Sequence, residues 1–374
     1  MPTTNDPLER FYSVIPAGGI GSRLWPLSRA DAPKFLHDLT GSGQTLLRDT
    51  WDRLAPLSGD QRIMVVTGRA HRAAVEEQLP ELADHNVVLE SEPKESSAAI
   101  GLAAAILNKR EPGVIVGSFA ADHVIKSEPL FHSAVVEAVH AADAGYIVTI
   151  GIQPTEPAIG FGYIKCAGPL PIEGAPSALS VNSFVEKPTL PVAKRYLSNP
   201  GSYLWNAGMF IARADRLLDA IGESQPELLA GLLELAEAWD TPARGAVVDQ
   251  VWPRLKKIAI DYSVAEPAAA AGKLVVIPGQ FDWDDVGDFA SIAKLHAGGR
   301  KRDLAILGEG ARVLADSSSG IVVSHTGRMI ALVGVEDIVV VDTPDALLVT
   351  TSANAQKVKA VVDALKLSGS SDVL

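Results

Sequence analysis

One short stretch of this chain is more informative than any other: Pro16-Ala17-Gly18-Gly19-Ile20-Gly21-Ser22-Arg23-Leu24-Trp25-Pro26-Leu27-Ser28-Arg29, with Pro33-Lys34 just beyond it. It follows an apolar run at 11–15 that predicts a first β-strand. Three glycines let the backbone approach a ligand closely and present N–H groups to an anion. Arg23 and Lys34 add the cationic side chains that a triphosphate needs. Together these features predict a site that holds a nucleotide by its phosphates.

Two better-known phosphate-binding loops do not match this stretch. A P-loop requires Gly-x4-Gly-Lys-Ser/Thr, and no Lys-Ser or Lys-Thr pair follows these glycines. A dinucleotide fingerprint requires Gly-x-Gly-x-x-Gly, and counted from Gly19 the third glycine position is occupied by Leu24. A plain glycine-rich connection is the remaining alternative, and the added arginine, Trp-Pro and Pro-Lys disfavour it.

The composition limits the class of protein. A chain of 374 residues exceeds the usual size of one hydrophobic core, which predicts one large domain and a smaller one. The formal net charge of −12 argues against a nucleic-acid partner, because surfaces that bind nucleic acid are normally basic. The single cysteine, Cys166, excludes an intrachain disulfide and favours a reducing compartment. Because we find no signal-peptide core and no apolar stretch of membrane-spanning length, we expect a cytoplasmic protein with no membrane partner.

Strands and helices alternate through the first half of the chain. We expect strands at 11–16, 62–67, 87–91, 113–119 and 146–151, and helices at 46–57, 71–79, 96–109 and 130–144. This order predicts an α/β fold with a Rossmann-like, mainly parallel sheet covered by helices. Ligands of such sheets bind beyond the carboxyl ends of the strands, which is where the glycine-rich stretch falls.

The second half departs from this alternation. We expect antiparallel strands at 161–167 and 179–187, a strand at 209–213, helices at 214–238 and 244–256, a strand at 274–278 and a helix at 288–297. A Gly-Gly-Arg-Lys-Arg stretch at 298–302 is a candidate linker. Short runs at 321–324, 329–333, 338–342 and 346–350, followed by an amphipathic helix at 353–367, predict a small β-helix-like unit.

Two acidic motifs follow predicted strands and are candidates for binding a metal ion. Asp122, in Ala-Ala-Asp-His, follows the strand at 113–119, at the edge where such sheets bind ligands. Asp284 and Asp285 lie in Phe-Asp-Trp-Asp-Asp-Val-Gly-Asp at 281–288, after the strand at 274–278. Aspartates in such places also cap helices and close turns, so the residues alone leave both interpretations open.

The opening stretch resembles the signature of the sugar-nucleotide pyrophosphorylases, and its Trp-Pro-Leu-Ser-Arg portion is similar to the mannose-1-phosphate guanylyltransferases. The resemblance extends over nearly the whole chain, including 338–346 and Gln-Lys-Val-Lys at 356–359. It implies a nucleotidyltransferase domain at 1–298 and a C-terminal β domain with a terminal helix at 303–374. The implied reaction joins GTP to mannose 1-phosphate, gives GDP-mannose and diphosphate, and uses Mg²⁺. Long members of the family carry a further cupin-type isomerase domain that this sequence lacks, so we expect a single activity.

The resemblance also implies roles for individual residues. Catalytic roles fall on Arg23, Lys34, Asp122 and Asp285, and the two aspartates bind the metal. Asp285 is preferred to Asp284 because Trp283 and Gly287 match the family's Trp-x-Asp-x-Gly. The implied nucleotide-binding residues are Ala17, Gly18, Gly19, Gly21, Ser22, Arg23, Lys34, Glu92, Pro93 and Asp122. The implied sugar-phosphate-binding residues are Gly162, Tyr163, Glu186, Lys187, Asn206 and Glu266.

Some features leave alternatives open. After Glu92-Pro93 the family often has Arg-Asn-Thr, whereas this chain has Lys94-Glu95-Ser96-Ser97, which leaves the guanine contacts undetermined. Another sugar 1-phosphate or another nucleotide would use the same chemistry. A non-catalytic paralogue that senses sugar nucleotides is the alternative outside enzymes, and it should have lost cations or carboxylates that are all present here. Because a small β unit exposes strand edges, we also expect a homodimer.

Overall fold

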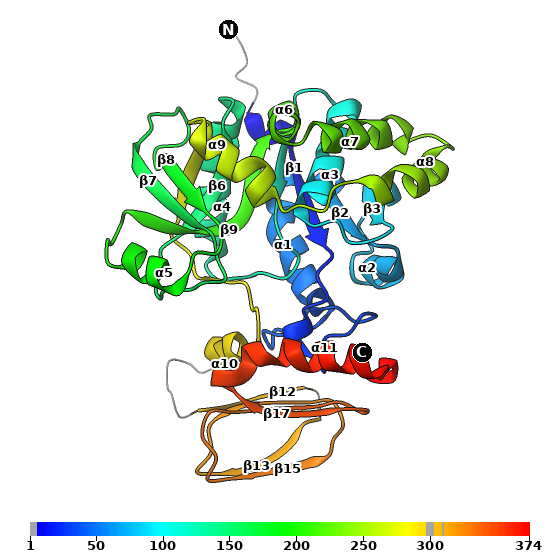
Figure 1. The fold of residues 1–374 in the computed structure, drawn as a ribbon, viewed down its shortest axis with the longest axis vertical. Helices are drawn as coiled ribbons and strands as arrows, with labels where there is room; N and C mark the ends of the chain where they lie inside the picture. The colour runs from blue at the N-terminus through cyan, green and yellow to red at the C-terminus, as the bar shows by residue number, and fades with distance from the viewer. Residues whose placement is uncertain (1–5, 297–302, 309) are drawn as a thin grey trace.

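A large α/β domain and a smaller β unit make up the protein (Figure 1). The structure is a computed structural model that describes residues 6–296, 303–308 and 310–374. The large sheet has nine strands in the order β3-β2-β1-β4-β9-β6-β10-β8-β7. These strands are β1 (Phe11–Ala17), β2 (Ile63–Gly68), β3 (Val87–Glu90), β4 (Ile115–Ser118), β6 (Ile147–Ile152), β7 (Tyr163–Pro169), β8 (Leu179–Val185), β9 (Tyr203–Arg213) and β10 (Leu274–Gly279).

The expected parallel strands are confirmed in the first half of the sheet. Strand β1 pairs in parallel with both β2 and β4, and β2 pairs in parallel with β3. Strand β9 then lies antiparallel between β4 and β6, and β7 and β8 form the expected antiparallel excursion. Strand β9 begins at Tyr203, six residues before the start expected from the sequence, so Asn206 lies within the sheet.

Apolar side chains on both faces of β1 explain its central place in the sheet. Val14 packs into one hydrophobic core, and Phe11 and Ile15 pack into a second core on the other face. A strand buried on both sides reads as a continuous apolar run, as this one does. The longer helices that contribute to the first core are α3 (Ser96–Arg110), α6 (Ala214–Ser224), α7 (Pro226–Trp239) and α8 (Arg244–Val251). The helices that supply the second are α1 (Leu46–Ser58), α2 (Arg72–Gln78) and α4 (Glu128–Asp143).

Several boundaries expected from the sequence are wrong. The helix expected at 214–238 is two helices, because Pro226 cannot continue a helix and biases Gln225 away from helical geometry. The helix expected at 244–256 ends at Val251, and a short 3₁₀ turn with a proline follows. The last helix, α11 (Val358–Ser368), starts later than expected, after a 3₁₀ segment at Ser352–Lys357. Two short helices were not anticipated, α5 (Leu190–Leu197) and α9 (Glu266–Ala270).

The C-terminal unit has the stacked, parallel strands expected of a β-helix-like domain. Its strands are β12 (Leu304–Leu307), β13 (Arg312–Asp316), β14 (Gly320–Ser324), β15 (Met329–Val333), β16 (Ile338–Asp342) and β17 (Leu347–Thr351). Strands β12, β14 and β16 pair in parallel, β13 pairs in parallel with β15, and β17 closes the larger sheet antiparallel to β16. The candidate linker at 298–302 lies outside the described residues. The domain division at 298 and 303 therefore stays a prediction.

A third hydrophobic core joins the C-terminal unit to the large domain. It contains Leu24 and Trp25 from the opening stretch, Phe289 from α10 (Phe289–His296), Val341 from β16 and Val358 from α11. Figure 1 shows α10 and α11 lying between the two parts of the molecule. The Trp-Pro-Leu portion of the opening stretch is therefore an interface segment.

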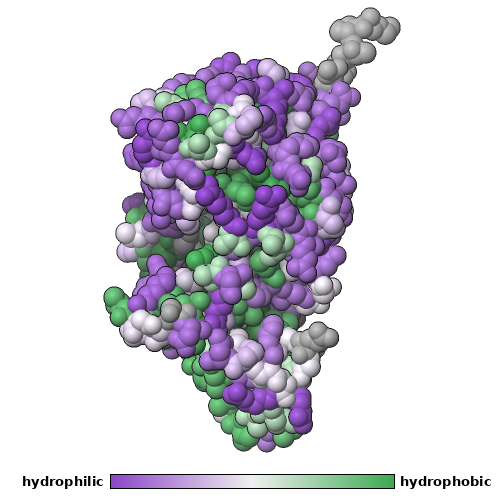
Figure 2. Space-filling view, turned by 90° about the vertical axis from the view of Figure 1, so that its right-hand side faces the viewer, coloured by the Kyte–Doolittle hydropathy of each residue, from purple (hydrophilic) through white to green (hydrophobic). Residues whose placement is uncertain are grey.

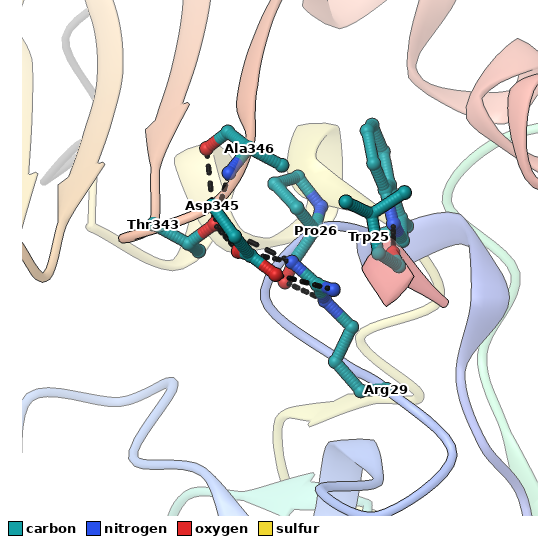
Figure 3. Close-up of polar contacts among 7 residues, drawn as sticks. Trp25, Pro26, Arg29, Thr343, Asp345 and Ala346 are labelled. Atoms are coloured by element: carbon teal, nitrogen blue, oxygen red, sulfur yellow. Dashed lines mark hydrogen bonds and ion pairs between the residues drawn. The ribbon is translucent and has the colours of Figure 1, made fainter. Parts of the chain in front are cut away.

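Polar contacts strengthen the same interface (Figure 3). The guanidinium of Arg29 reaches the carboxylate of Asp345, with N···O distances of 2.8 and 3.1 Å, and also contacts the hydroxyl of Thr343. The indole N–H of Trp25 donates to the backbone oxygen of Val373 at 2.6 Å. A bidentate arginine–carboxylate pair fixes direction as well as distance, so it orients the C-terminal unit on the large domain. Among the described residues, no helix is both long enough and apolar enough to cross a membrane.

Candidate active site

The glycine-rich loop follows β1 and is shaped to bring Lys34 close. Ala17 is the buried last residue of β1, and Gly18 to Ile20 are exposed beyond it. Gly21 has a φ of 74°, and a Cβ at this position would lie 2.7 Å from the Cβ of Lys34. Both the left-handed backbone and the close approach require glycine here. Ser22 begins the short 3₁₀ turn that carries Arg23.

Lys34 connects the two acidic motifs that the sequence singled out. Its side chain is buried, and its Nζ lies 2.9 Å from Oδ2 of Asp122. The same Nζ donates to the backbone oxygen of Asp285. Residues 88 and 251 positions away in the chain thus meet at one ammonium group.

The acidic turn is held in place by a short two-stranded ladder. Strand β11 (Trp283–Asp284) pairs antiparallel with β5 (Val124–Ile125), which directly follows the Asp122-His123 motif. The carboxylate of Asp284 accepts from the N–H of Val286 at 2.7 Å, closing the turn on itself. Val286 is fully buried with a φ of 45°, a strained conformation for a β-branched residue and one that tends to occur at functional sites.

Asp285 faces the loop, which favours it over Asp284 as the metal ligand. A Cβ at Gly287 would lie 3.3 Å from Oδ2 of Asp285 and 3.4 Å from Nη2 of Arg23, so both side chains converge on this glycine. Asp284 already uses an oxygen within its own turn. The preference for Asp285 remains a prediction, with this geometry in its favour.

Charge and burial act differently on the two candidate metal ligands. Burial acts to raise the pKa of Asp122, but the ammonium of Lys34, with a smaller contribution from His123, outweighs it and holds that pKa below its usual range. At Asp285 burial wins, and its pKa is raised despite Lys34 and His123. A divalent cation would add positive charge beside both carboxylates and favour their ionised forms.

The donor set at this corner suits a hard divalent cation. It offers two carboxylates, and the described part of the chain contains no cluster of three or more His, Cys, Asp or Glu side chains placed to bind a metal. Mg²⁺ is usually bound through one or two carboxylates, with waters and substrate phosphates completing the coordination shell. Asp122 and Asp285 fit that pattern.

Aromatic side chains link this corner to the second candidate site. The indole N–H of Trp283 donates to Nδ1 of His123 at 3.3 Å, which occupies that ring nitrogen and supports a structural role for the histidine. Phe161 packs edge-on against both Trp283 and Trp205, with ring centroids 5.1 Å apart in each pair. A Cβ at Gly208 would lie 3.9 Å from the His123 ring. The two candidate sites are therefore neighbours.

The predicted sugar-phosphate residues gather around Gly162. A Cβ at this glycine would lie 2.6 Å from Oε2 of Glu186 and 3.3 Å from the Cβ of Asn206. Glu186 is largely buried and forms a 2.9 Å ion pair with Lys187, whose side chain is 60% exposed. Lys187 has a φ of 47°, a strained backbone conformation of a kind found at functional sites. Tyr163 is buried and donates its hydroxyl to the backbone oxygen of Ala158.

Asp261 belongs to this group, although the sequence directed attention to Glu266. The amide of Asn206 donates to Oδ1 of Asp261 at 3.0 Å and accepts from the hydroxyl of Thr149 at 2.7 Å. Burial and the nearby charge of Glu186 raise the pKa of Asp261 to about 6, and Glu266 contributes to the same shift. The residue lies in a π-helical turn, Asp261–Ala265, a feature that is frequent at functional sites. In the sequence it opens the stretch Asp-Tyr-Ser-Val-Ala-Glu at 261–266, from which the resemblance implied only Glu266.

We expect Gly162→Ala to damage sugar-phosphate binding selectively. The added methyl would collide with Glu186 and with the ring of Phe184, at 2.6 and 2.9 Å. The carboxylate must then move, so KM for the sugar 1-phosphate should rise about tenfold or more, because small misplacements of binding groups are costly. KM for the triphosphate should change less than twofold, since Gly21 and Lys34 are untouched. Equal changes in both constants in steady-state assays would contradict this assignment.

The raised pKa of Asp261 predicts a pH effect on the same substrate. As pH falls through about 6 the carboxylate gains a proton and loses acceptor capacity, so KM for the sugar phosphate should rise. The phosphate monoester also titrates near pH 6, so wild type must be compared with Asp261→Asn. The ratio of the variant's KM to the wild-type KM should fall towards one below pH 6. If the ratio stays constant from pH 5 to 8, Asp261 is not the group that makes KM for the sugar phosphate depend on pH.

The predicted base-side segment is held by contacts within the protein. The carboxylate of Glu92 pairs with the buried ammonium of Lys94 at 2.7 Å, and the indole N–H of Trp252 donates to the backbone oxygen of Glu92 at 2.8 Å. Lys94 also donates to the backbone oxygen of Pro253. Lys94, which stands where the family often has arginine, therefore anchors this segment to the 3₁₀ turn that follows α8. Pro93 is exposed, and its role in nucleotide binding stays a prediction.

Glu90 was missed from the sequence although it faces the glycine-rich loop. It ends β3 with only 7% of its surface exposed, and a Cβ at Gly18 would lie 3.6 Å from its Oε2. Burial raises the pKa of Glu90 to about 7. A polar residue at the end of a short strand reads as solvated, so the sequence pattern offered no signal for it.

Comparison with protein families identifies the class. The family model for nucleotidyl transferases matches residues 12–301, and the model for the MannoseP isomerase/GMP-like beta-helix domain matches residues 310–365. The chain therefore belongs to the nucleotidyl transferase family and is an enzyme of that class, with a C-terminal β-helix-like domain. Enzymes of this family generally use a divalent metal ion, in keeping with the two carboxylates.

Individual relatives narrow the comparison. Xanthan biosynthesis protein XanB of Xanthomonas campestris pv. campestris (strain B100) is 36% identical, over 96% of this chain and 74% of its own length. A mannose-1-phosphate guanylyltransferase of Escherichia coli K12 is 35% identical over the same shares. Among solved structures, a Thermus thermophilus protein named mannose-1-phosphate geranyltransferase matches with a TM-score of 0.82 and 29% identity, over 96% of this chain and 99% of that one.

Proposed function

We propose that this enzyme is a mannose-1-phosphate guanylyltransferase, which converts GTP and α-mannose 1-phosphate into GDP-mannose and diphosphate. The observation that carries the proposal is the meeting of Lys34 with Asp122 and Asp285 beside Arg23, next to a second polar site around Glu186. The relatives that carry this name are similar over almost the whole chain.

The chain's own residues divide the work between the two substrates. Arg23 and the loop amides hold the β- and γ-phosphates that leave as diphosphate, and Lys34 holds the triphosphate. Lys187 holds the phosphate of the sugar, whose oxygen attacks the α-phosphorus in line, while Glu186 and Asn206 accept and donate hydrogen bonds at the sugar hydroxyls. Because the nucleophile is already ionised, alignment and charge neutralisation suffice and no general base is needed. A Mg²⁺ ion bound by Asp122 and Asp285 would supply further neutralisation of the phosphates.

A substrate panel tests this proposal. Diphosphate release should be fastest with GTP and mannose 1-phosphate, when each of four nucleoside triphosphates is combined with mannose, glucose or heptose phosphates. It should require a divalent cation and stop on addition of a chelator. If another pair of substrates is turned over faster, the protein is still a nucleotidyltransferase, but GTP and mannose 1-phosphate are not its preferred substrates.

The quaternary structure and location are further parts of the proposal. We propose a homodimer, because exposed apolar side chains lie on the strands of the C-terminal unit, where Figure 2 shows apolar surface. These residues are Leu314, Met329, Val333, Leu347 and Val349. The last two lie on β17, an edge strand open to pairing. Light scattering should give twice the monomer mass. A cytoplasmic location, and the lack of nucleic-acid and membrane partners, stay predictions from composition.

A further inference from the structure

One side chain of the C-terminal segment reaches the predicted catalytic centre. Gln356 lies in the 3₁₀ segment before α11, and its Oε1 accepts from Nη1 of Arg23 at 2.9 Å. Its Nε2 donates to Oδ2 of Asp288. A single amide therefore joins the arginine of the opening stretch to the segment that carries the acidic turn.

Asp288 is a firm anchor for this contact. It is 5% exposed, and its Oδ1 accepts from the N–H groups of Ala290 and Ser291 at 2.8 and 3.1 Å, so it caps the start of α10. Its second oxygen is the one that receives Gln356. Because Asp288 lies three residues after Asp285, the amide is tied to the rigid end of the turn that presents Asp285.

The backbone around Gln356 is also fixed. Ala355 and Val358, on either side, are buried in the third hydrophobic core together with Leu24, the neighbour of Arg23. The apolar and the polar contacts thus come from the same short segments. Docking of the C-terminal unit places the amide, and the amide in turn sets the direction of the guanidinium.

The chemistry of a primary amide suits this place. The guanidinium of Arg23 can only donate hydrogen bonds, and the carboxylate of Asp288 accepts them. The group that joins the two must therefore offer an acceptor to Arg23 and a donor to Asp288, as a primary amide does. A glutamate would attract Arg23 but repel Asp288, and a lysine would do the reverse. With Nη1 engaged by Gln356, the other guanidinium nitrogen, Nη2, faces Gly287 and Asp285.

We infer that Gln356 is a positioning residue for the proposed reaction, through which the C-terminal unit orients Arg23 towards the leaving diphosphate. The inference rests on the proposed function of Arg23. It makes the β-helix-like unit a part of the catalytic centre, because a residue outside the nucleotidyl transferase domain completes the hydrogen bonding of a phosphate-binding side chain.

The test compares Gln356→Met, which keeps the length of the side chain, with Asn354→Ala as the matched control. Asn354 is exposed in the same 3₁₀ segment, and its amide donates to Thr351 within the C-terminal unit. In the reverse reaction we expect Gln356→Met to raise KM for diphosphate about tenfold, since a loosened phosphate ligand binds less well. KM for GDP-mannose and the melting temperature should match those of Asn354→Ala. Gln356→Glu should likewise raise KM for diphosphate, because its carboxylate would repel that of Asp288.

A double-mutant cycle separates positioning from a general structural effect. When Gln356→Met is added to Arg23→Ala, kcat/KM for diphosphate should fall less than twofold further, because the arginine that Gln356 positions is already absent. Full additivity, or a normal diphosphate KM in Gln356→Met while Arg23→Ala is impaired, would overturn the inference. Full activity of Arg23→Ala itself would instead overturn the proposed role of Arg23.

Discussion

Asp285→Asn should lower the turnover number about 10²- to 10³-fold, the range seen when one preorganised electrostatic group is removed from an active site. The substitution keeps the shape of the side chain but removes its charge. The proposed divalent cation, which would neutralise the phosphates, then loses one of its two carboxylate ligands. The β5–β11 ladder and the strained turn at Val286 do not use the Asp285 side chain. The variant should therefore fold normally, and its circular dichroism and melting temperature should resemble those of the wild type.

Asp284→Asn is the matched control for this experiment. Its carboxylate closes the turn through the N–H of Val286, a contact that an amide oxygen can still accept. We expect less than a tenfold loss of diphosphate release. If Asp284→Asn were the more damaging change, the metal-binding role would pass to Asp284. Near-normal turnover of both variants with native spectra would remove the acidic turn from the catalytic centre.

The strands that bear the site were predictable because local patterns define them. Strand β1 is apolar on both faces, and the glycine-rich stretch begins where that run stops. The aspartates at 122 and 285 became candidates because each follows a predicted strand, and Asp285 was preferred only through the resemblance, which matches Trp283 and Gly287. The break between α6 and α7 was less visible. The helical spacing of apolar residues runs across 214–238, and Pro226 alone marks the point where the first helix must end.

Contacts between distant segments were not predictable from these patterns. The opening stretch indicated a lysine for a triphosphate, but nothing local indicated that Lys34 would touch both acidic motifs. Trp25 lies in the family-like motif yet packs against the C-terminal unit, and its partner Val373 is 348 positions away. Asp261 and Glu90 were missed for the same reason, because burial among distant residues makes these carboxylates unusual.

Lys34→Met should lower kcat/KM for GTP about 10²-fold or more, because it removes an ammonium group that contacts both acidic motifs. Methionine is similar in length, so the tight contact with Gly21 is retained. A second readout does not depend on turnover. Without the ammonium, Asp122 and Asp285 lose a competitor for the divalent cation, so Mg²⁺ should raise the melting temperature more in the variant than in the wild type.

Lys109→Met is the control for the charge change itself, because Lys109 on α3 pairs with Glu237 on α7, away from the two acidic motifs. It should retain wild-type kcat/KM and a wild-type response to Mg²⁺. A Lys34→Met enzyme with normal use of GTP would show that Lys34 serves the protein's own carboxylates and leaves the triphosphate to Arg23. A variant that loses activity but gains no extra stabilisation from Mg²⁺ would place the cation away from Asp122 and Asp285. Loss of both GTP use and competition for Mg²⁺ is what the contacts of Lys34 lead us to expect, because the same side chain lies against both acidic motifs and against Gly21 of the glycine-rich loop.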